Sequence, residues 1–468
     1  MIDFQEIEKY KENNRIEAKR ATGGFPGSLW ETYSAFANTL GGVILLGVEE
    51  FPDKSLHPVK LPYPEGLVLQ FWAEVNDPEK VSVNILSEEN VSVIETEGKR
   101  IVAITVPRAM RYDRPVYING SAAGGTYRRN GEGDYRCSPG EVQAMARDAA
   151  LKSQDMKILE YMGLESLDMR TVTRYRQRMR QSRPGHAWEL LDHGKFLYRL
   201  GAAGRGADRR LHPTAAGLLM FGRCNEICRE YPEYDLVYRE EGDRGTVRKT
   251  LRSGAGGLEN VFDFYSAVSE ELLNPDNSEE VNGAMEEAMA NCLINTDYYG
   301  IGGVEISKRN RKVVFSNPGS FRLELEEARA GGISDPRNEM LIKMFKLVNV
   351  GEGAGKGIPN IFAVWNRQGW AAPRLKESFD PDRITLELEF SGSPAVSRIP
   401  RRGKSGRTLE QAAVIEYLTA NVSAAPGNIA ELLNVTGRQA REVLAELEEK
   451  EIVTAEGRGR GRRYRLKA

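Results

Sequence analysis

A helical pattern followed directly by an apolar run constrains the N-terminal part of the chain most strongly. Ser28 and Glu31 stand at capping-box spacing, and the apolar residues that follow recur every three to four positions or so, which predicts a helix. Gly41 and Gly42 end this pattern, because glycine adopts the left-handed backbone conformation of a helix end at little cost. Residues 43–48 are uninterrupted apolar residues and predict a strand buried on both faces.

The segments RIEAKR and SLWETYSAFANTLGGVILLGV resemble the AlbA-type nucleic-acid-binding domain shared with the Schlafen proteins. Nuclease members of that family use an acidic trio, which the resemblance places at Glu12, Glu17 and either Glu49 or Glu50. Three such carboxylates could hold a hard divalent cation, which activates water for phosphodiester cleavage. The alternative is a domain that only binds nucleic acid, in which Glu17 pairs with a neighbouring basic residue.

The chain as a whole has 468 residues, which favours two to four domains. Its formal net charge of −2 means that any affinity for nucleic acid must come from local basic patches. The sequence shows neither a signal peptide nor a run of about 18 apolar residues, and its cysteines and histidines lack metal-site spacing. These features predict a cytoplasmic protein that has no membrane partner.

Short β segments are expected at residues 81–85, 91–95 and 100–106. The phrase VYINGSAAGGTYRR, which contains Arg128 and Arg129, resembles the end of the same AlbA-type domain. Arginines interleaved with tyrosines and glycines suit phosphate contact and base stacking, although a loop with packed tyrosines is the alternative. A helix from about residue 138 completes this domain near residue 150, and a charged helical connector is expected over residues 151–210.

Two features between residues 211 and 392 predict a nucleotide-binding domain. Glu287 and Asn291 are four residues apart on a predicted helix and therefore share a face. That spacing suits a site in which the asparagine ligates Mg²⁺ and the glutamate orients the attacking water. The glycine-rich loop at residues 351–357 precedes a helix and offers free amides and a positive dipole end to phosphate oxygens.

The segments EEAMANCLINTDYY, SNPGSF, SDPRNEML and GEGAGKGI resemble the divergent Bergerat-type ATP-binding domain of bacterial transcriptional regulators. The resemblance implies ATP with Mg²⁺ as ligand, Asn291 as a metal ligand and Glu287 as the base of a weak ATPase. Asn295 and Thr296 replace the family's histidine and arginine, which favours binding over efficient hydrolysis. A fold that has lost its ligand is the alternative. The implied ATP contacts are Asn291, Asn317, Gly319, Gly351, Gly353, Gly355, Lys356 and Gly357.

Residues 393–407 are rich in Ser, Pro, Gly and Arg and predict a linker. Residues 408–468 show three helical patterns and a terminal hairpin, an order that looks like a winged helix-turn-helix. Protein contact is the alternative use of that fold. The predicted DNA contacts are Arg438, Gln439 and Arg441 of the recognition helix and Arg458, Arg460 and Arg462 of the wing.

The sequence thus predicts a multidomain α/β protein: an AlbA-type α+β domain, a Bergerat-like α/β sandwich and a winged helix. The favoured function is an ATP-binding, DNA-binding transcriptional regulator that forms a homo-oligomer, with RNA as a second nucleic-acid partner. A Schlafen-type metal-dependent nuclease acting on RNA is the main alternative, and an oligomeric scaffold is a third.

Overall fold

The structure, a computed structural model, describes residues 12–242, 246–351 and 357–390 and, in the C-terminal part, residues 414, 418, 424–433, 437–449, 452–456 and 463–467. The chain forms two units, Met1–Ser391 and Gly392–Ala468, and each is described by itself. Across these described residues, no helix combines the length and the apolar character needed to cross a membrane.

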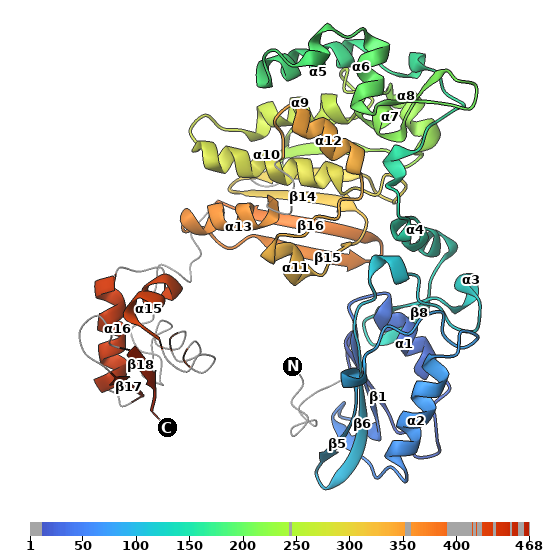
Figure 1. Ribbon diagram of the computed structural model, residues 1–468, viewed down its shortest axis with the longest axis vertical. Coiled ribbons are helices and arrows are strands. Elements are labelled where there is room, and N and C mark those ends of the chain that lie inside the picture. The colour runs from blue at the N-terminus through green and yellow to red at the C-terminus, as the bar shows by residue number, and fades with distance from the viewer. Residues whose placement is uncertain are drawn as a thin grey trace. The chain divides into compact units, whose positions relative to one another are not determined.

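A four-stranded sheet organises the N-terminal part of the first unit (Figure 1). Its order is β1-β2-β6-β5; β1 runs parallel to β2, and the other neighbours are antiparallel. Helices α1 and α2 pack on one face, and a smaller apolar cluster covers the other. The bounds are β1 Ile16–Lys19, α1 Leu29–Ala37, β2 Gly42–Leu46, β3 Val48–Glu50, β4 Leu56–Pro58, α2 Pro64–Val75, β5 Val91–Thr96, β6 Lys99–Val106, α3 Ala122–Gly125, β7 Tyr127–Asn130, β8 Gly133–Arg136 and α4 Pro139–Ala149.

Strand β2 confirms the prediction of a strand buried on both faces. Ile44 and Leu46 belong to the cluster beneath the helices, whereas Leu45 belongs to the cluster on the opposite face. Gly41 adopts φ +71°, and its amide donates to the carbonyl of Phe36 at 2.9 Å. A left-handed glycine therefore closes the turn after α1, as the sequence predicts.

Two local predictions for this part are wrong. Ser28 makes no capping hydrogen bond, because its backbone (φ −80°, ψ 1°) is not extended and its hydroxyl accepts from Lys19 Nζ at 3.0 Å. Glu31, the second member of the predicted capping box, accepts instead from the Tyr127 hydroxyl at 3.2 Å. Residues 81–85 form no strand and contribute one isolated β-bridge.

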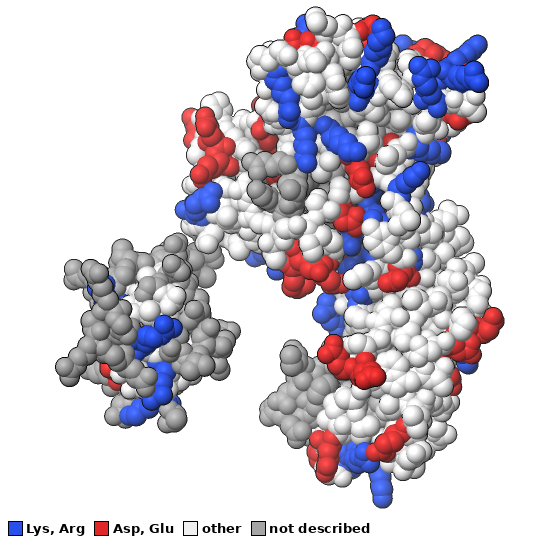
Figure 2. Space-filling view, viewed as in Figure 1, with Lys and Arg blue, Asp and Glu red and all other residues white. Residues whose placement is uncertain are grey.

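The segment 151–210, predicted as a charged helical connector, contributes buried side chains to the hydrophobic core of the central part. Val172, Tyr175 and Met179 of α5 are fully buried, and the Tyr175 hydroxyl donates to the carbonyl of Met344 at 2.6 Å. Figure 2 shows lysine and arginine side chains gathered over α5 and α6. The bounds are α5 Met169–Ser182, α6 His193–Leu200, β9 Ala203–Arg205, β10 Leu211–Pro213, α7 Ala215–Phe221 and α8 Cys224–Glu230.

The central part is built on a six-stranded mixed sheet in the order β12-β11-β13-β14-β16-β15. β11 and β13 run parallel, and the other neighbours are antiparallel. Helices α9, α10, α12 and α13 bury their apolar residues in one cluster with the sheet. The bounds are β11 Leu236–Glu241, β12 Val247–Arg252, α9 Val261–Leu272, α10 Glu279–Ile294, β13 Val304–Arg309, β14 Lys312–Pro318, α11 Leu325–Ala330, α12 Glu339–Leu347, α13 Gly357–Arg367, β15 Arg374–Phe379 and β16 Asp382–Glu389.

One row of side chains crosses this sheet on the face that the helices cover. Cross-strand partners point to the same face, so the row can be followed through the register of all six strands. It places aromatic and aliphatic residues opposite α10, where they form an apolar surface. The row is Leu251, Tyr238, Ile306, Phe315, Leu386 and Leu375.

The second unit contains helices α15 Pro426–Leu433 and α16 Gly437–Glu449 and an antiparallel pair, β17 Val453–Glu456 and β18 Arg463–Leu466. Val414 and Leu418 are helical and buried in the same apolar cluster as residues of α16 and β17. The order of these elements agrees with the predicted pattern. The wing residues Arg458, Arg460 and Arg462 lie outside the described residues.

Candidate functional site

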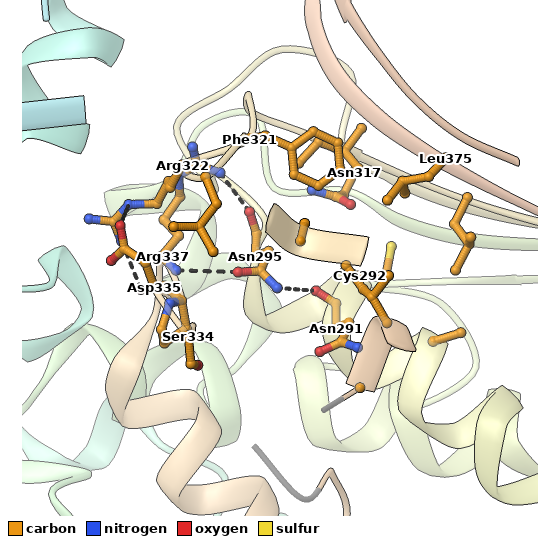
Figure 3. Close-up of a pocket in the computed structure, with 18 of the residues that line it drawn as sticks. Asn291, Cys292, Asn295, Asn317, Phe321, Arg322, Ser334, Asp335, Arg337 and Leu375 are labelled. Atoms are coloured by element: carbon orange, nitrogen blue, oxygen red, sulfur yellow. Dashed lines mark hydrogen bonds and ion pairs between the residues drawn. The ribbon is translucent and has the colours of Figure 1, made fainter. Parts of the chain in front are cut away.

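A cavity of about 150 Å³ lies between α10 and the inner face of the central sheet (Figure 3). Its floor is apolar, because Phe315, Leu375, Ile384 and Leu386 line it from the sheet. Helix α10 supplies another wall, and the start of α13 and the segments around β14 and α12 supply the rest. The row of side chains across the sheet therefore ends in an open space rather than in a fully packed core.

The predicted pair on α10 faces this cavity. Glu287 and Asn291 both line it, and Asn291 Nδ2 donates to Glu287 Oε1 at 3.3 Å. Gly357, the first residue of α13, lines it as well, and a Cβ there would overlap Glu287 Oε1 and lie 2.7 Å from Asn291 Nδ2. A Cβ at Gly357 would force the ends of the Glu287 and Asn291 side chains to shift, so the glycine leaves both side chains their place on the cavity wall.

The glycine-rich loop is described at its two ends. Gly351 adopts φ +69°, and its Cβ position lies 3.5 Å from Glu287 Oε2, so this glycine also lies next to α10. Gly357 stands at the other end. The remaining predicted phosphate ligands, Gly353, Gly355 and Lys356, lie outside the described residues.

The predicted Asn317-Pro318-Gly319 turn forms one edge of the cavity. Asn317 lines the cavity and is 3% exposed, and its Nδ2 donates to the Pro318 carbonyl at 3.0 Å. Gly319 adopts φ +110° behind this edge, where a Cβ would overlap the guanidinium of Arg337. The turn thus brings a buried amide to the apolar floor and leaves room for the arginine behind it.

The SDPRN segment caps the C-terminus of α10, a role that the sequence reasoning missed. Asn338 Nδ2 donates to the carbonyls of Ile294 and Thr296 at 2.8 and 2.9 Å. Arg337 Nη1 donates to the carbonyl of Asn295 at 2.6 Å. Carbonyls at a helix end lack partners inside the helix, so these bonds hold the end of α10 against the cavity wall. The motif itself was the available signal.

Charged residues gather at one end of the cavity, away from Leu375 (Figure 3). Arg322, Asp335 and Arg337 line this end. Asp335 Oδ2 accepts from Arg111 Nε at 2.5 Å and lies 3.7 Å from Arg322 Nε. Sequence reasoning could not find this group, because Arg111 and Asp335 are 224 positions apart.

Residues of the N-terminal domain hold the same end of the cavity in place. Arg108 binds Glu377 through two bonds of 2.6 and 2.9 Å and also donates to the Phe321 carbonyl at 2.9 Å. Asp148 accepts from Arg337 at 2.9 and 2.6 Å. Burial opposes ionisation of Asp148, but Arg337 outweighs burial and lowers the pKa of this carboxyl. The cavity wall is therefore tied directly to the N-terminal domain.

The two arginines predicted to contact nucleic acid are engaged inside the protein. Arg128 binds Asp382 through two bonds of 2.6 and 2.9 Å. Arg129 binds Glu17 at 2.8 Å and Asp134 at 2.9 Å. Their side chains are only 6% and 1% exposed. A phosphate would have to displace these carboxylates, and the nucleic-acid role of both arginines stays a prediction.

The structure brings together the acidic trio that the resemblance implies. Burial raises the pKa of Glu12, a hydrogen bond from the Ala18 amide opposes that rise, and the charges of Glu17 and Glu50 add to it. Glu49 instead lies 3.6 Å from Arg20 near the surface. Glu50 is therefore the third member of the cluster.

This cluster does not fit a metal site in its present arrangement. Glu17 accepts from Arg129 and from Lys19 Nζ, the latter at 2.9 Å, and Glu50 accepts from Lys54 Nζ at 3.2 Å. Basic side chains thus already bind Glu17 and one oxygen of Glu50, whereas Glu50 Oε1 is buried without a hydrogen-bond partner among the described residues. In the part of the chain that the structure describes, no three His, Cys, Asp or Glu side chains are arranged to hold a metal ion.

The C-terminal unit places Arg438, Gln439 and Arg441 on α16, as predicted. Arg441 is exposed. Contact with DNA stays a prediction for all three residues and for the wing arginines.

Sequence families assign three stretches of the first unit. The family described as "Schlafen, AlbA_2" matches residues 12–138. A Schlafen AlbA_2 domain is present. The family described as "Putative ATP-dependent DNA helicase recG C-terminal" matches residues 302–386, so a RecG-related C-terminal domain is present as well. This second match begins after α10, so Glu287 and Asn291 lie outside it. The family described as "Domain of unknown function (DUF8451)" matches residues 143–237.

Two solved structures are similar to parts or all of the chain. The DIP2311 protein from Corynebacterium diphtheriae is 15% identical over 97% of this chain and 95% of that chain, with a TM-score of 0.45. The N-terminal domain of a putative ATP-dependent DNA helicase RecG-related protein from Nitrosomonas europaea is 32% identical over 28% of this chain and 88% of that chain, with a TM-score of 0.23. Both TM-scores are low, so the domain assignments rest on the family matches. No curated protein matches the chain.

Proposed function

We propose that this protein is a nucleic-acid-binding regulator whose central domain binds ATP in the cavity beneath α10. The Schlafen AlbA_2 and RecG-related domains support the general assignment to nucleic-acid-binding, ATP-related proteins. The observation that carries the proposal is convergence: Glu287, Asn291, Asn317 and Gly357 come from three separate motifs and line one cavity.

The cavity has the chemical character that an adenine nucleotide requires. Ligand sites combine an apolar lining with a few polar groups that fix orientation. Phe315, Leu375 and Leu386 provide an apolar floor for a planar base, and the amide of Asn317 supplies a polar group beside it. Asn291 would hold the Mg²⁺ that accompanies ATP, through its side-chain oxygen.

Binding is proposed in preference to rapid hydrolysis. Glu287, the proposed base of a weak ATPase, accepts a hydrogen bond from Asn291 and lies against Gly357. Asn295 stands where the related family has histidine, and its side-chain amide Nδ2 donates a hydrogen bond to the Asn291 carbonyl at 3.0 Å. These contacts hold Glu287 and Asn291 in place on α10, and Asp335, the other carboxylate that lines the cavity, is paired with Arg111.

The contacts between the cavity wall and the N-terminal domain give ATP a physical route to nucleic-acid affinity. A ligand shifts an equilibrium only when it binds one arrangement better than another. Phe321, Asp335 and Arg337 line the cavity and also bind Arg108, Arg111 and Asp148, respectively. ATP that favours one placement of these wall residues therefore favours one state of the N-terminal domain.

The C-terminal unit is proposed to be a winged helix-turn-helix that reads duplex DNA. In support, its helices and hairpin follow the predicted order, and α16 carries Arg438, Gln439 and the exposed Arg441. A recognition helix contacts base edges with residues of its first turns.

The direct test is duplex binding by the full chain with and without ATP and Mg²⁺, followed by fluorescence anisotropy at fixed salt. ATP is expected to change the DNA affinity by about 5–150-fold, the usual range of allosteric coupling, and DNA must change ATP affinity by the same factor. An Asn291→Ala variant is expected to bind DNA without responding to ATP. Equal DNA affinity at saturating ATP would contradict the regulatory proposal.

The nuclease alternative rests on the closeness of Glu12, Glu17 and Glu50. It is tested with labelled tRNA and single- and double-stranded DNA, incubated with Mg²⁺ or Mn²⁺ and with chelator. Metal-dependent cleavage that is lost in the double variant Glu12→Ala, Glu17→Ala would reverse the order of the two functions. Intact substrates would leave the regulator as the better account.

A further inference from the structure

Arg322 is a buried arginine whose hydrogen bonds are incomplete. Its side chain is 8% exposed, and it lines both the main cavity and a smaller neighbouring cavity of about 20 Å³. Nη1 donates to the Pro336 carbonyl at 2.7 Å, and Nη2 donates to the Asp148 carbonyl at 3.3 Å. Nε is buried and has no hydrogen-bond partner among the described residues.

The ion pair between Arg322 and Asp335 leaves the Nε donor unsatisfied. Asp335, at 3.7 Å, is beyond hydrogen-bond distance and already accepts from Arg111. The other nearby carboxylate, Asp148, is bonded by Arg337 through two bonds. A buried donor without an acceptor is costly even when its charge is paired. An anion in the cavity would supply what the protein does not.

We propose that Arg322 binds the phosphate chain of the cavity's ligand. This inference rests on the proposed function, since it assigns the charged end of the same cavity to phosphate and leaves the apolar floor to the base. A guanidinium suits phosphate oxygens because it offers several donors in one plane. Figure 3 shows Arg322, Asp335 and Arg337 together at one side of the cavity and Leu375 at the other, which matches the two ends of a nucleotide.

Two neighbouring facts agree with this assignment. Burial lowers the pKa of Arg322, and the nearby carboxylates of Asp335 and Asp148 only partly oppose this shift. Arg337, by contrast, is held by Asp148 and by backbone carbonyls, so it is occupied as a structural group. Arg322 is thus the arginine at this end that retains a donor for a ligand.

The test compares three ligands on the full chain by calorimetry: adenosine, ATP and tripolyphosphate. In the unmodified protein, ATP is expected to bind more tightly than adenosine, and tripolyphosphate is expected to bind. Arg322→Gln is expected to weaken ATP and tripolyphosphate by roughly tenfold to a hundredfold, the strength of a charge-assisted hydrogen bond, and to leave adenosine unchanged.

Arg383→Gln is the matched control. Arg383 is also partly buried in the central sheet and donates to Ser316 Oγ and the Gly303 carbonyl at 2.9 Å, but it does not line the cavity. Its substitution is expected to leave all three affinities unchanged. If Arg322→Gln does not fold, Arg322→Lys retains the charge and removes the free Nε, and tripolyphosphate affinity is expected to fall severalfold.

The outcomes separate this inference from the proposed function. Unchanged ATP and tripolyphosphate affinity in Arg322→Gln, or in Arg322→Lys when that variant must be used, overturns the inference. Adenosine binding that gains nothing from phosphates also overturns it, while a nucleoside site remains. Tripolyphosphate binding that depends on Arg322, without adenosine binding, supports the inference and rejects the nucleotide function.

Discussion

The acidic cluster of the N-terminal domain and the cavity of the central domain both carry charged residues singled out by motif, yet the fold treats them differently. Glu17 and one oxygen of Glu50 are bonded by basic side chains of their own domain, whereas Glu287 and Asn291 border open space. A charged residue that matches a family motif is therefore weak evidence for a bound ligand until its hydrogen-bond and ion-pair partners in the folded protein are known. Charged residues that are already paired within the protein indicate a structural role. Polar residues that border a cavity and keep donors without acceptors indicate ligand binding.

The largest expected effect concerns the ion pair that ties the cavity wall to the N-terminal domain. Arg337→Ala leaves Asp148 buried without its partner, so the free energy of unfolding should fall by about 3–5 kcal/mol. Urea denaturation measures this loss. The control is Arg367→Ala, which removes an exposed pair with Glu280 and should cost no more than about 1 kcal/mol. Equal losses in the two variants would show that the wall is not anchored there.

A smaller effect is expected where α13 meets α10. Gly357→Ala introduces a Cβ that the ends of Glu287 and Asn291 must move to accommodate, so ATP affinity should fall and unfolding free energy should fall by about 1 kcal/mol or less. Gly283→Ala, on the same helix as Glu287, meets nothing within 4 Å and should be neutral or stabilising by up to about 1 kcal/mol. Calorimetry and thermal unfolding distinguish the two variants.

The acidic cluster should respond in the opposite direction and weakly. The pKa of Glu12 is raised, so its ionised form at neutral pH opposes folding, and Glu12→Gln should stabilise the protein by at most about 1 kcal/mol at pH 7. The difference should disappear as pH falls below the unfolded value of 4.5, because the wild-type carboxyl is then protonated in both states. Thermal unfolding of both proteins across this range measures it, and destabilisation at pH 7 would contradict the electrostatic account.

Local patterns predicted the regular elements well, because periodicity and turn chemistry act over a few residues. Strand β2 is buried on both faces and Gly41 adopts φ +71° after α1, as the sequence predicts. The predicted capping role of Ser28 is wrong because Lys19, nine positions earlier, donates to its hydroxyl. Arg128 shows the same limit on a larger scale: its partner Asp382 lies 254 positions away, so no local pattern indicates that the arginine is buried.

The residues of the candidate site likewise fall into two groups, those that a local motif predicts and those that depend on tertiary contacts. Glu287, Asn291, Asn317 and Gly357 could be named from their motifs, since each motif is continuous in sequence. Arg322 could not, because its importance comes from a neighbouring carboxylate that Arg111 occupies from another domain. Residues that complete a site through tertiary contacts can be identified only from the three-dimensional structure.

The most direct test of the central claim is a calorimetric titration of ATP with Mg²⁺ into the full chain and into its Asn291→Ala variant. Saturable binding at one site per chain in the first protein, weakened at least tenfold in the folded variant, is the result that the cavity predicts. Absence of ATP binding, or equal affinity in the two proteins, would contradict the assignment of this cavity to a nucleotide.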